Sequence, residues 1–223
     1  MPRSDAQTLE WGEGVGIPLI DSDGDAIDDS YKFELGAFAL NFNPDESNVG
    51  EWLTHWRVFD RLIFDSVFGF STSSTTILDN VTSESQFASD PSFSFSKLDA
   101  YIWVRNGDEP VPGSEWFLAR AETWSFPEFG GDCCANEFIQ WSTTDLSSSD
   151  VPVWGWQNVT STPDGTEGSG VFSQMGFDER SVITPPYERA PAIQTHTFIP
   201  EPSSALLTLL AGFGLLLRRR RNA

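Results

Sequence analysis

Cysteine, histidine and methionine are scarce, because the chain of 223 residues contains only two of each. The two cysteines, Cys133 and Cys134, are adjacent, so no disulfide framework can form within one chain. Neighbouring Cα atoms lie about 3.8 Å apart, below the usual disulfide range of about 4.4–6.8 Å. The pair therefore forms a strained bridge, stays as two free thiols or links two chains. No histidine or second cysteine pair accompanies it, which argues against a thiolate metal site.

Basic residues are also few, and four of the 13 form a single run, Arg218–Arg221. The chain has 33 acidic residues and a formal net charge of −20. Only one acid, Glu201, follows residue 199, so residues 1–199 contain 32 acids and 9 bases and carry a net charge of −23. A body of this charge repels phosphate backbones, so we expect no nucleic-acid binding. It should be soluble and attract cations.

Alternation of helix and strand patterns is missing, which argues against a parallel α/β sheet. Short aromatic and β-branched runs occur instead, separated by Gly, Pro, Asp and Ser. They predict an all-β fold, an antiparallel β-sandwich of jelly-roll type with one short helix, followed by a C-terminal hydrophobic helix. Residues 71–98 are read as loops and edge strands. The other expected strand regions are 7–20, 30–42, 100–105, 115–124, 137–141, 151–156, 170–177 and 192–199.

Two local features refine this prediction. In the run 30–42 the apolar alternation changes phase at Gly36, which predicts a bulge or bend there. The short helix is expected over residues 48–59, with Asn48 as N-cap and Glu51 three residues later. Apolar side chains then recur at helical spacing at Trp52, Trp56 and Phe59.

The segment 200–223 has three parts in order: Pro200-Glu201-Pro202, an uncharged apolar run over 203–217, and Arg218–Arg221. As a helix, the 15 residues of the run span about 22 Å, against a hydrocarbon core of about 30 Å. Snorkelling arginines close part of that gap. Because positive charge stays on the cytoplasmic side, the run predicts a membrane span with residues 1–199 outside. The span is formed chiefly by Ser203, Ala205, Leu206, Leu207, Leu209, Leu210, Phe213, Leu215, Leu216 and Leu217.

A buried core helix and a plain tail anchor are the alternatives for this segment. Four consecutive arginines directly after the apolar run argue against a core helix, and Pro202 fits the first turn of a helix that starts at the outer face. The arrangement closely resembles the PEP-CTERM sorting signal of Gram-negative bacteria. Pro200, Glu201 and Pro202 match the motif, the run 203–217 its apolar span, and Arg218, Arg219, Arg220 and Arg221 its basic stop.

This resemblance implies a protein of two parts: an acidic extracellular domain, 1–199, and a sorting signal, 200–223. It implies export, transient anchoring in the inner membrane, and recognition by an exosortase as partner, with the product at the cell surface or in the extracellular matrix. Family members are usually associated with exopolysaccharide and biofilm. The segment Phe33-Glu34-Leu35-Gly36-Ala37-Phe38 and the Trp-rich region after it are also similar to such proteins, though more loosely.

Export of this kind needs an N-terminal secretion signal, and residues 1–7 contain no apolar run. We therefore expect a translation start upstream of Met1, or a trimmed chain. Ser4 and Ala6 fit a small-x-small cleavage pattern, which would make Gln7 the first residue of the mature protein.

The acidic segment 21–29 suggests either a turn or a calcium site. Asp21, Asp23 and Asp25 supply oxygen ligands at alternate positions, as Ca²⁺ prefers. The match to an EF-hand loop fails at its sixth position, Ala26, and at its twelfth, Lys32. A hairpin turn at Asp23-Gly24 explains the same residues, so the turn is the leading interpretation, calcium the alternative, and no other cofactor is expected.

Tryptophan is abundant, with nine residues, and most are expected in the core. Trp154 and Trp156 lie two apart in a predicted edge strand, and exposed rings there would offer a sugar contact. Catalytic signals are weak, because no Gly-x-Ser-x-Gly elbow occurs and abundant carboxylates alone do not identify a glycosidase pair. We therefore expect a non-enzymatic surface or matrix protein. The alternatives are a carbohydrate-binding module that uses exposed tryptophans, and a sandwich-fold glycosidase or lyase.

Overall fold

Short β-strands are the main regular elements of the described structure. The computed structural model describes residues 7–13, 19–23, 27–62, 72–128, 138–146, 150, 152–159, 183–184, 187–188 and 192–197. The strands are β1 (Gln7–Gly12), β2 (Leu19–Ile20), β3 (Lys32–Phe38), β4 (Trp56–Leu62), β5 (Thr72–Ile77), β6 (Tyr101–Arg105), β7 (Glu115–Ala119), β8 (Ile139–Ser142), β9 (Trp156–Val159), β10 (Ile183–Thr184), β11 (Tyr187–Glu188), β12 (Ala192–Gln194) and β13 (His196–Thr197). The helical segments are η1 (Glu46–Glu51), α1 (Trp52–His55) and η2 (Thr143–Asp145). The prediction of a β-rich fold with one short helix is confirmed.

The strands form a five-stranded sheet in the order β13-β7-β6-β3-β4 and two three-stranded sheets, β5-β1-β8 and β2-β12-β9. A further ladder joins β10 to β11. Most pairings among these strands are antiparallel, as predicted, but β1–β8 and β2–β12 are parallel. More than 120 residues separate β1 from β8 in the chain, and a long connection of this kind permits a parallel alignment that a tight hairpin excludes.

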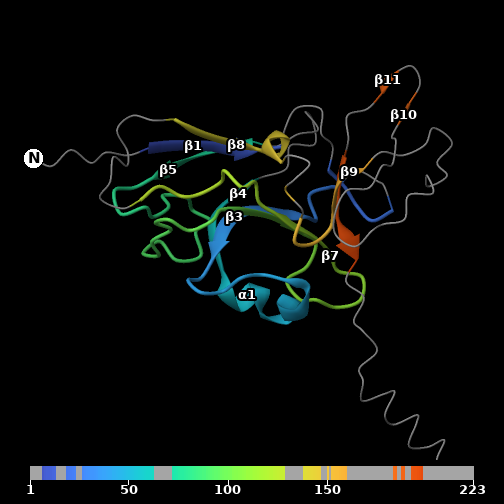
Figure 1. The fold of residues 1–223 in the computed structure, drawn as a ribbon, viewed down its shortest axis with the longest axis horizontal. Helices are drawn as coiled ribbons and strands as arrows, with labels where there is room; N and C mark the ends of the chain where they lie inside the picture. The colour runs from blue at the N-terminus through green and yellow to red at the C-terminus, as the bar shows by residue number, and fades with distance from the viewer. Residues whose placement is uncertain are drawn as a thin grey trace, which may run out of the picture.

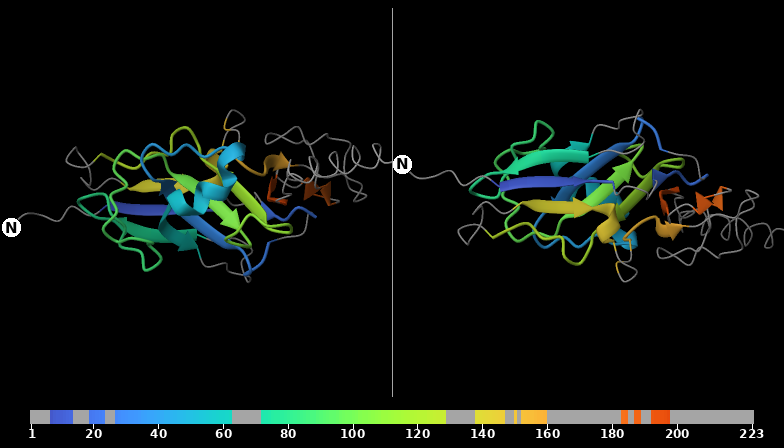
Figure 2. Two further views of the ribbon diagram at one scale, coloured as in Figure 1. Left: turned by 90° about the horizontal axis from the view of Figure 1, so that it is seen from below. Right: turned by 90° about the horizontal axis from the view of Figure 1, so that it is seen from above.

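The sheet β5-β1-β8 faces one side of the five-stranded sheet, and α1 covers the other side (Figure 1). The two views of Figure 2 show the same order, with α1 in front of the strands from below and β5, β1 and β8 in front from above. Side chains alternate accordingly along the central strand β6. Ile102 and Val104 enter the core between the sheets, whereas Tyr101 and Trp103 face α1.

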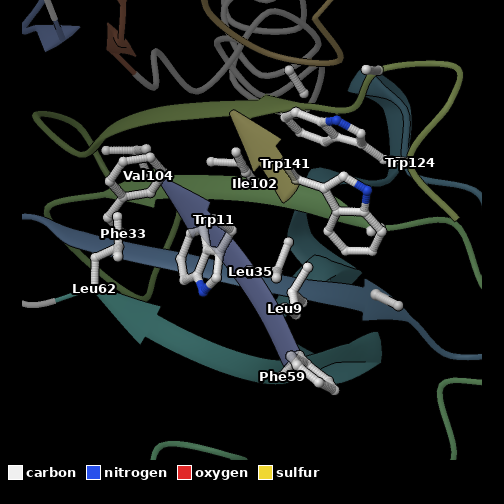
Figure 3. Packing of buried hydrophobic residues seen from close by; sticks show 14 of the residues in the cluster. Leu9, Trp11, Phe33, Leu35, Phe59, Leu62, Ile102, Val104, Trp124 and Trp141 are labelled. Atoms are coloured by element: carbon white, nitrogen blue, oxygen red, sulfur yellow. The ribbon is translucent and has the colours of Figure 1, made fainter. Parts of the chain in front are cut away.

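The core between the two sheets is apolar and includes residues from both (Figure 3). Leu9 and Trp11 come from β1, and Phe33 and Leu35 come from β3. On the opposite side of the five-stranded sheet lies a second group, which we call the tryptophan cluster. Its members are Phe38, Val49, Trp52, Trp56, Val58, Tyr101, Trp103, Trp116 and Leu118.

The helical region is shorter than predicted. Asp45, not Asn48, is the N-cap, and Asn48 is the third residue of the capping box. Helix α1 ends at His55, and residues 56–59 belong to β4. Trp56 lies opposite Phe38 in the ladder with β3. Its backbone is therefore paired within the sheet, and this long-range pairing overrides the helical spacing of the aromatic residues.

The predicted irregularity at Gly36 is confirmed in position, but the extra residue lies on the partner strand. Leu35 pairs with Asp60 and Gly36 pairs with Val58, so Phe59 is the additional residue of a bulge in β4. A Cβ atom on Gly36 would lie 2.7 Å from the Cζ2 atom of Trp56, which explains why glycine is needed here. The bulge also turns both Phe59 and Asp60 toward the core between the sheets.

Other predicted elements are displaced or lie outside the described residues. Strand β7 ends at Ala119, and the region 151–156 contributes only an isolated bridge between Trp154 and Leu118 before β9 begins. Cys133, Cys134 and the predicted strand 170–177 fall outside the described residues. The sorting segment 200–223 does so too, including Pro200–Pro202, the span 203–217 and Arg218–Arg221. Within the described residues no helix has the length and apolar character that a membrane crossing requires.

Candidate functional site

A polar groove of about 540 Å³ lies where β4 and β5 meet at the edge of the two sheets. Seven of its lining residues carry a hydroxyl or an amide, two carry a carboxylate, and one each is basic and aromatic. We call it the β4–β5 groove. It is lined by Asp60, Arg61, Thr72, Ser73, Ser74, Thr75, Thr76, Glu84, Ser85, Gln86 and Phe87.

Asp60 lies at the base of the groove and is hydrogen-bonded to several of the surrounding segments. Its side chain is 3 % exposed, and the bulge at Phe59 directs it toward β1. Its Oδ2 accepts hydrogen bonds from Trp11 Nε1 at 2.8 Å and from Ser73 Oγ at 2.7 Å. Its Oδ1 accepts a third bond from Ser85 Oγ. Three donors from three separate segments thus satisfy a buried carboxylate that would otherwise be costly to bury.

The outer wall of the groove is the segment 78–87, which folds back against both strands. Glu84 N–H donates to Thr76 O at 3.1 Å, and Ser83 Oγ donates to Phe59 O. The turn at the start of this segment places the buried Val81 at φ +56°, a strained conformation for a β-branched residue. The Val81 carbonyl accepts a bond from Phe95 N–H at 2.8 Å, which helps to hold it there. Strain of this kind persists where surrounding contacts fix the backbone, as at ligand sites.

Arg61 connects the groove to a buried ionic network. Its guanidinium donates to Glu34 Oε1 and lies over the Phe87 ring, 5.4 Å from the centroid. Glu34 is fully buried, and its Oε2 accepts from Arg105 Nη1 at 2.7 Å and from Trp56 Nε1 at 2.9 Å. All four bonds converge on one carboxylate, so Arg61 is already ion-paired before any ligand arrives.

A second cavity of about 720 Å³ lies on the other side of β5, toward β8. It shares Thr72, Ser73 and Ser74 with the first and reaches Gln140 on β8. Its two tryptophans, Trp11 and Trp141, belong to the core and expose little ring surface. The β4–β5 groove differs in that two of its hydroxyls donate to one buried carboxylate, Asp60.

A separate cluster forms around Glu115 at the start of β7. Its carboxylate accepts bonds from Ser22 Oγ, Tyr31 OH and Thr195 Oγ1, which join the N-terminal acidic turn to the C-terminal strands. Burial alone would raise the pKa of Glu115, but these hydrogen bonds outweigh it and hold the pKa below its usual value. Burial and the neighbouring Glu115 raise the pKa of the Tyr31 hydroxyl.

Two residues of the suggested calcium site, Asp21 and Asp23, lie in that acidic turn. Asp21 Oδ1 accepts a bond from Asp23 N–H at 3.0 Å, which forms a side-chain turn. Gly24, at which the hairpin turn is predicted, lies outside the described residues. Among the described residues, no group of three His, Cys, Asp or Glu side chains is placed to hold a metal ion. Asp25 lies outside the described residues, so the calcium site stays a prediction.

The tryptophans are mostly core residues, as expected. Eight of the nine are buried, and Trp154 is half-buried. Trp154 packs against the tryptophan cluster and donates its Nε1–H to the His196 carbonyl at 3.0 Å, whereas Trp156 is 4 % exposed. Both rings flank the His196 imidazole, at centroid distances of 5.6 and 5.5 Å. Their packing favours the core interpretation over the predicted sugar contact.

The β4–β5 groove is not predicted from the sequence, because the pattern of residues 71–98 indicates only loops and edge strands. Strand β5 does lie at a sheet edge. One usable signal was Asp60, the acidic residue of β4, which directly follows the aromatic Phe59. Comparison with protein-family models, with curated proteins and with solved structures finds no match to this chain.

Proposed function

We propose that this chain is an exported, non-enzymatic surface or extracellular-matrix protein whose residues 200–223 form a sorting signal of the PEP-CTERM type. One observation carries the proposal: Pro200-Glu201-Pro202, an uncharged apolar run and four arginines follow one another in this order. The run is apolar enough to insert as a helix, and the arginines keep its far end in the cytoplasm. An exosortase in the inner membrane would then recognise the motif at the outer face.

The composition of the described core supports a cut at this motif. Both hydrophobic clusters are built from residues between Leu9 and Ile193. The last described strand, β13, ends at Thr197, three residues before Pro200. Removal of the segment after Pro202 would leave the contacts among these described residues in place.

We also propose that the fold is an antiparallel β-sandwich of jelly-roll type. Two sheets that share an apolar core, with short strands and long connections, are what a jelly-roll-type sandwich would present. The hydrophobic helix over 203–217 would serve only during sorting. A net charge of −23 on residues 1–199 would keep the released domain soluble, and its expected surroundings are the exopolysaccharide and other matrix components.

A motif variant in the native host tests this proposal. Replacement of Pro200, Glu201 and Pro202 by alanine should leave a full-length chain in the inner-membrane fraction, because the span and the arginines are retained. Replacement of Pro185 and Pro186 by alanine is the matched control and should still yield the shortened, released form. Equal processing of both variants would contradict the proposed role of the motif.

A further inference from the structure

Asp60 determines the direction of the hydrogen bonds that two hydroxyls of the β4–β5 groove make. Ser73 and Ser85 each have one hydroxyl proton, and each donates it to the Asp60 carboxylate. Their oxygens can therefore only accept hydrogen bonds from anything that enters the groove. Trp11 donates to the same carboxylate from below, so the arrangement is set before binding. At these two positions the groove therefore favours a ligand that donates hydrogen bonds.

The charges of the lining residues disfavour an anion. Arg61 is the single basic side chain among the lining residues, and its Nε and Nη2 already donate to Glu34. Glu84 is exposed at the rim and carries a carboxylate. A phosphate, sulfate or uronate would meet this carboxylate, and the one guanidinium among the lining residues is already ion-paired with Glu34.

A cation is also poorly matched to the groove. Asp60 is the buried carboxylate, and three donors already satisfy it. The exposed carboxylate of Glu84 alone gives an amine little beyond a solvent-screened ion pair. The remaining lining consists mainly of hydroxyls and of the Gln86 amide, which both donate and accept. Such a surface suits an uncharged partner with many hydroxyl groups.

The volume and the half-buried aromatic ring agree with such a ligand. A cavity of about 540 Å³ falls within the range of about 300–1,000 Å³ that is usual for small-molecule sites. Phe87 is half-buried and held by Arg61, so it offers a fixed apolar edge beside the hydroxyls. The bonds of Ser83 to the Phe59 carbonyl and of Glu84 N–H to the Thr76 carbonyl hold the wall that carries Ser85, Gln86 and Phe87.

We propose that the β4–β5 groove binds a segment of a neutral oligosaccharide. Sugar hydroxyls donate to Ser73 and Ser85, and Gln86 bonds to the sugar from the rim. The site is distinct from Trp154 and Trp156, whose rings pack in the interior. This inference goes beyond the sorting function and rests on the groove alone, so it holds or fails whether or not residues 200–223 are processed.

The test uses the purified full chain. A glycan array that contains neutral and uronate-bearing oligosaccharides is probed first, and the strongest neutral glycan is then titrated by calorimetry. Binding of neutral glycans should be seen, and Gln86→Ala should weaken it about five- to tenfold, the loss expected for one hydrogen bond. Gln140→Ala, an exposed glutamine of the second cavity, is the matched control and should bind as the unaltered chain does.

Three results would overturn the proposal. The first is no binding of any neutral glycan at millimolar concentration by a chain whose circular dichroism shows the β-fold. The second is loss of binding in Gln140→Ala and not in Gln86→Ala, which would place the sugar in the second cavity. The third is binding of spermidine, but of no neutral glycan, with loss in Glu84→Gln, which would identify a cation site instead.

Discussion

The indole Nε1–H of Trp11 on β1 donates to Asp60 Oδ2 on β4 at 2.8 Å, and this buried bond connects the two facing sheets. Removal of the donor with retention of an aromatic ring should therefore leave the carboxylate one partner short. Trp11→Phe is expected to lower the free energy of unfolding by about 2–3 kcal/mol, the scale of a lost bond to a buried charged group. Urea denaturation followed by fluorescence measures it.

Trp103→Phe is the matched control for this prediction. Trp103 is equally buried, but its Nε1–H has no hydrogen-bond partner among the described residues. Its replacement loses packing contacts but also removes an unsatisfied donor, so the cost should be smaller. An equal or larger loss in Trp103→Phe would show that the Trp11–Asp60 bond contributes little.

Gly36→Ala should destabilise the chain through steric overlap alone. The added Cβ would lie 2.7 Å from Trp56 Cζ2 and would also meet the Arg57 carbonyl, so β3 and β4 must separate locally. Overpacking of this kind costs about 1–3 kcal/mol. Gly50→Ala places its Cβ in open space and should be neutral or slightly stabilising. Thermal unfolding of the two variants measures the difference. Equal melting temperatures would contradict the close approach of Gly36 to Trp56 and Arg57.

Arg105→Met tests the buried ionic network. Among the described residues it leaves the fully buried Glu34 with Arg61 as its only charged partner, and loss of one member of a buried ion pair costs about 3–5 kcal/mol. Arg120→Met breaks the partly exposed pair with Asp99 and should cost about 0–1 kcal/mol. Guanidinium unfolding of both variants should show this difference, and similar values would mean that water reaches Glu34.

The depressed pKa of Glu115 predicts an acid-sensitive contribution to stability. The folded-state pKa lies below the unfolded value, so the contribution is present above the unfolded pKa and is lost as the pH falls through the folded pKa. The urea midpoint of the unaltered chain should exceed that of Glu115→Gln at pH 7, and the gap should narrow as the pH falls below about 4. A gap that stays constant down to pH 3 would be contrary to this expectation.

The sequence was sufficient to predict the β-rich fold, the short helix and the interior location of most tryptophans, because apolar alternation and turn residues report local structure directly. The predicted end of the helix was wrong, because Trp52, Trp56 and Phe59 show helical spacing although Trp56 and Phe59 belong to the bulged strand β4. The parallel pairing of β1 with β8, which joins residues far apart in the chain, was also not predicted. Such long-range pairing leaves no local pattern.

The β4–β5 groove was hidden for a related reason. Ser73 and Ser85 are unremarkable in a polar stretch, and only the bulge at Phe59 brings Asp60 between them. Asp21 and Asp23, by contrast, were recognisable as a turn from the sequence, because the Asx geometry is local. The tripartite segment 200–223 is likewise a local pattern, so the sequence alone supports the proposal of a sorting signal.

Intact-mass analysis of the protein recovered from its native host tests whether the chain is exported and processed. We predict a mature form that ends close to Pro200–Pro202 and lacks the apolar run and the four arginines. A mature form that retains Leu206 through Arg221 would contradict it.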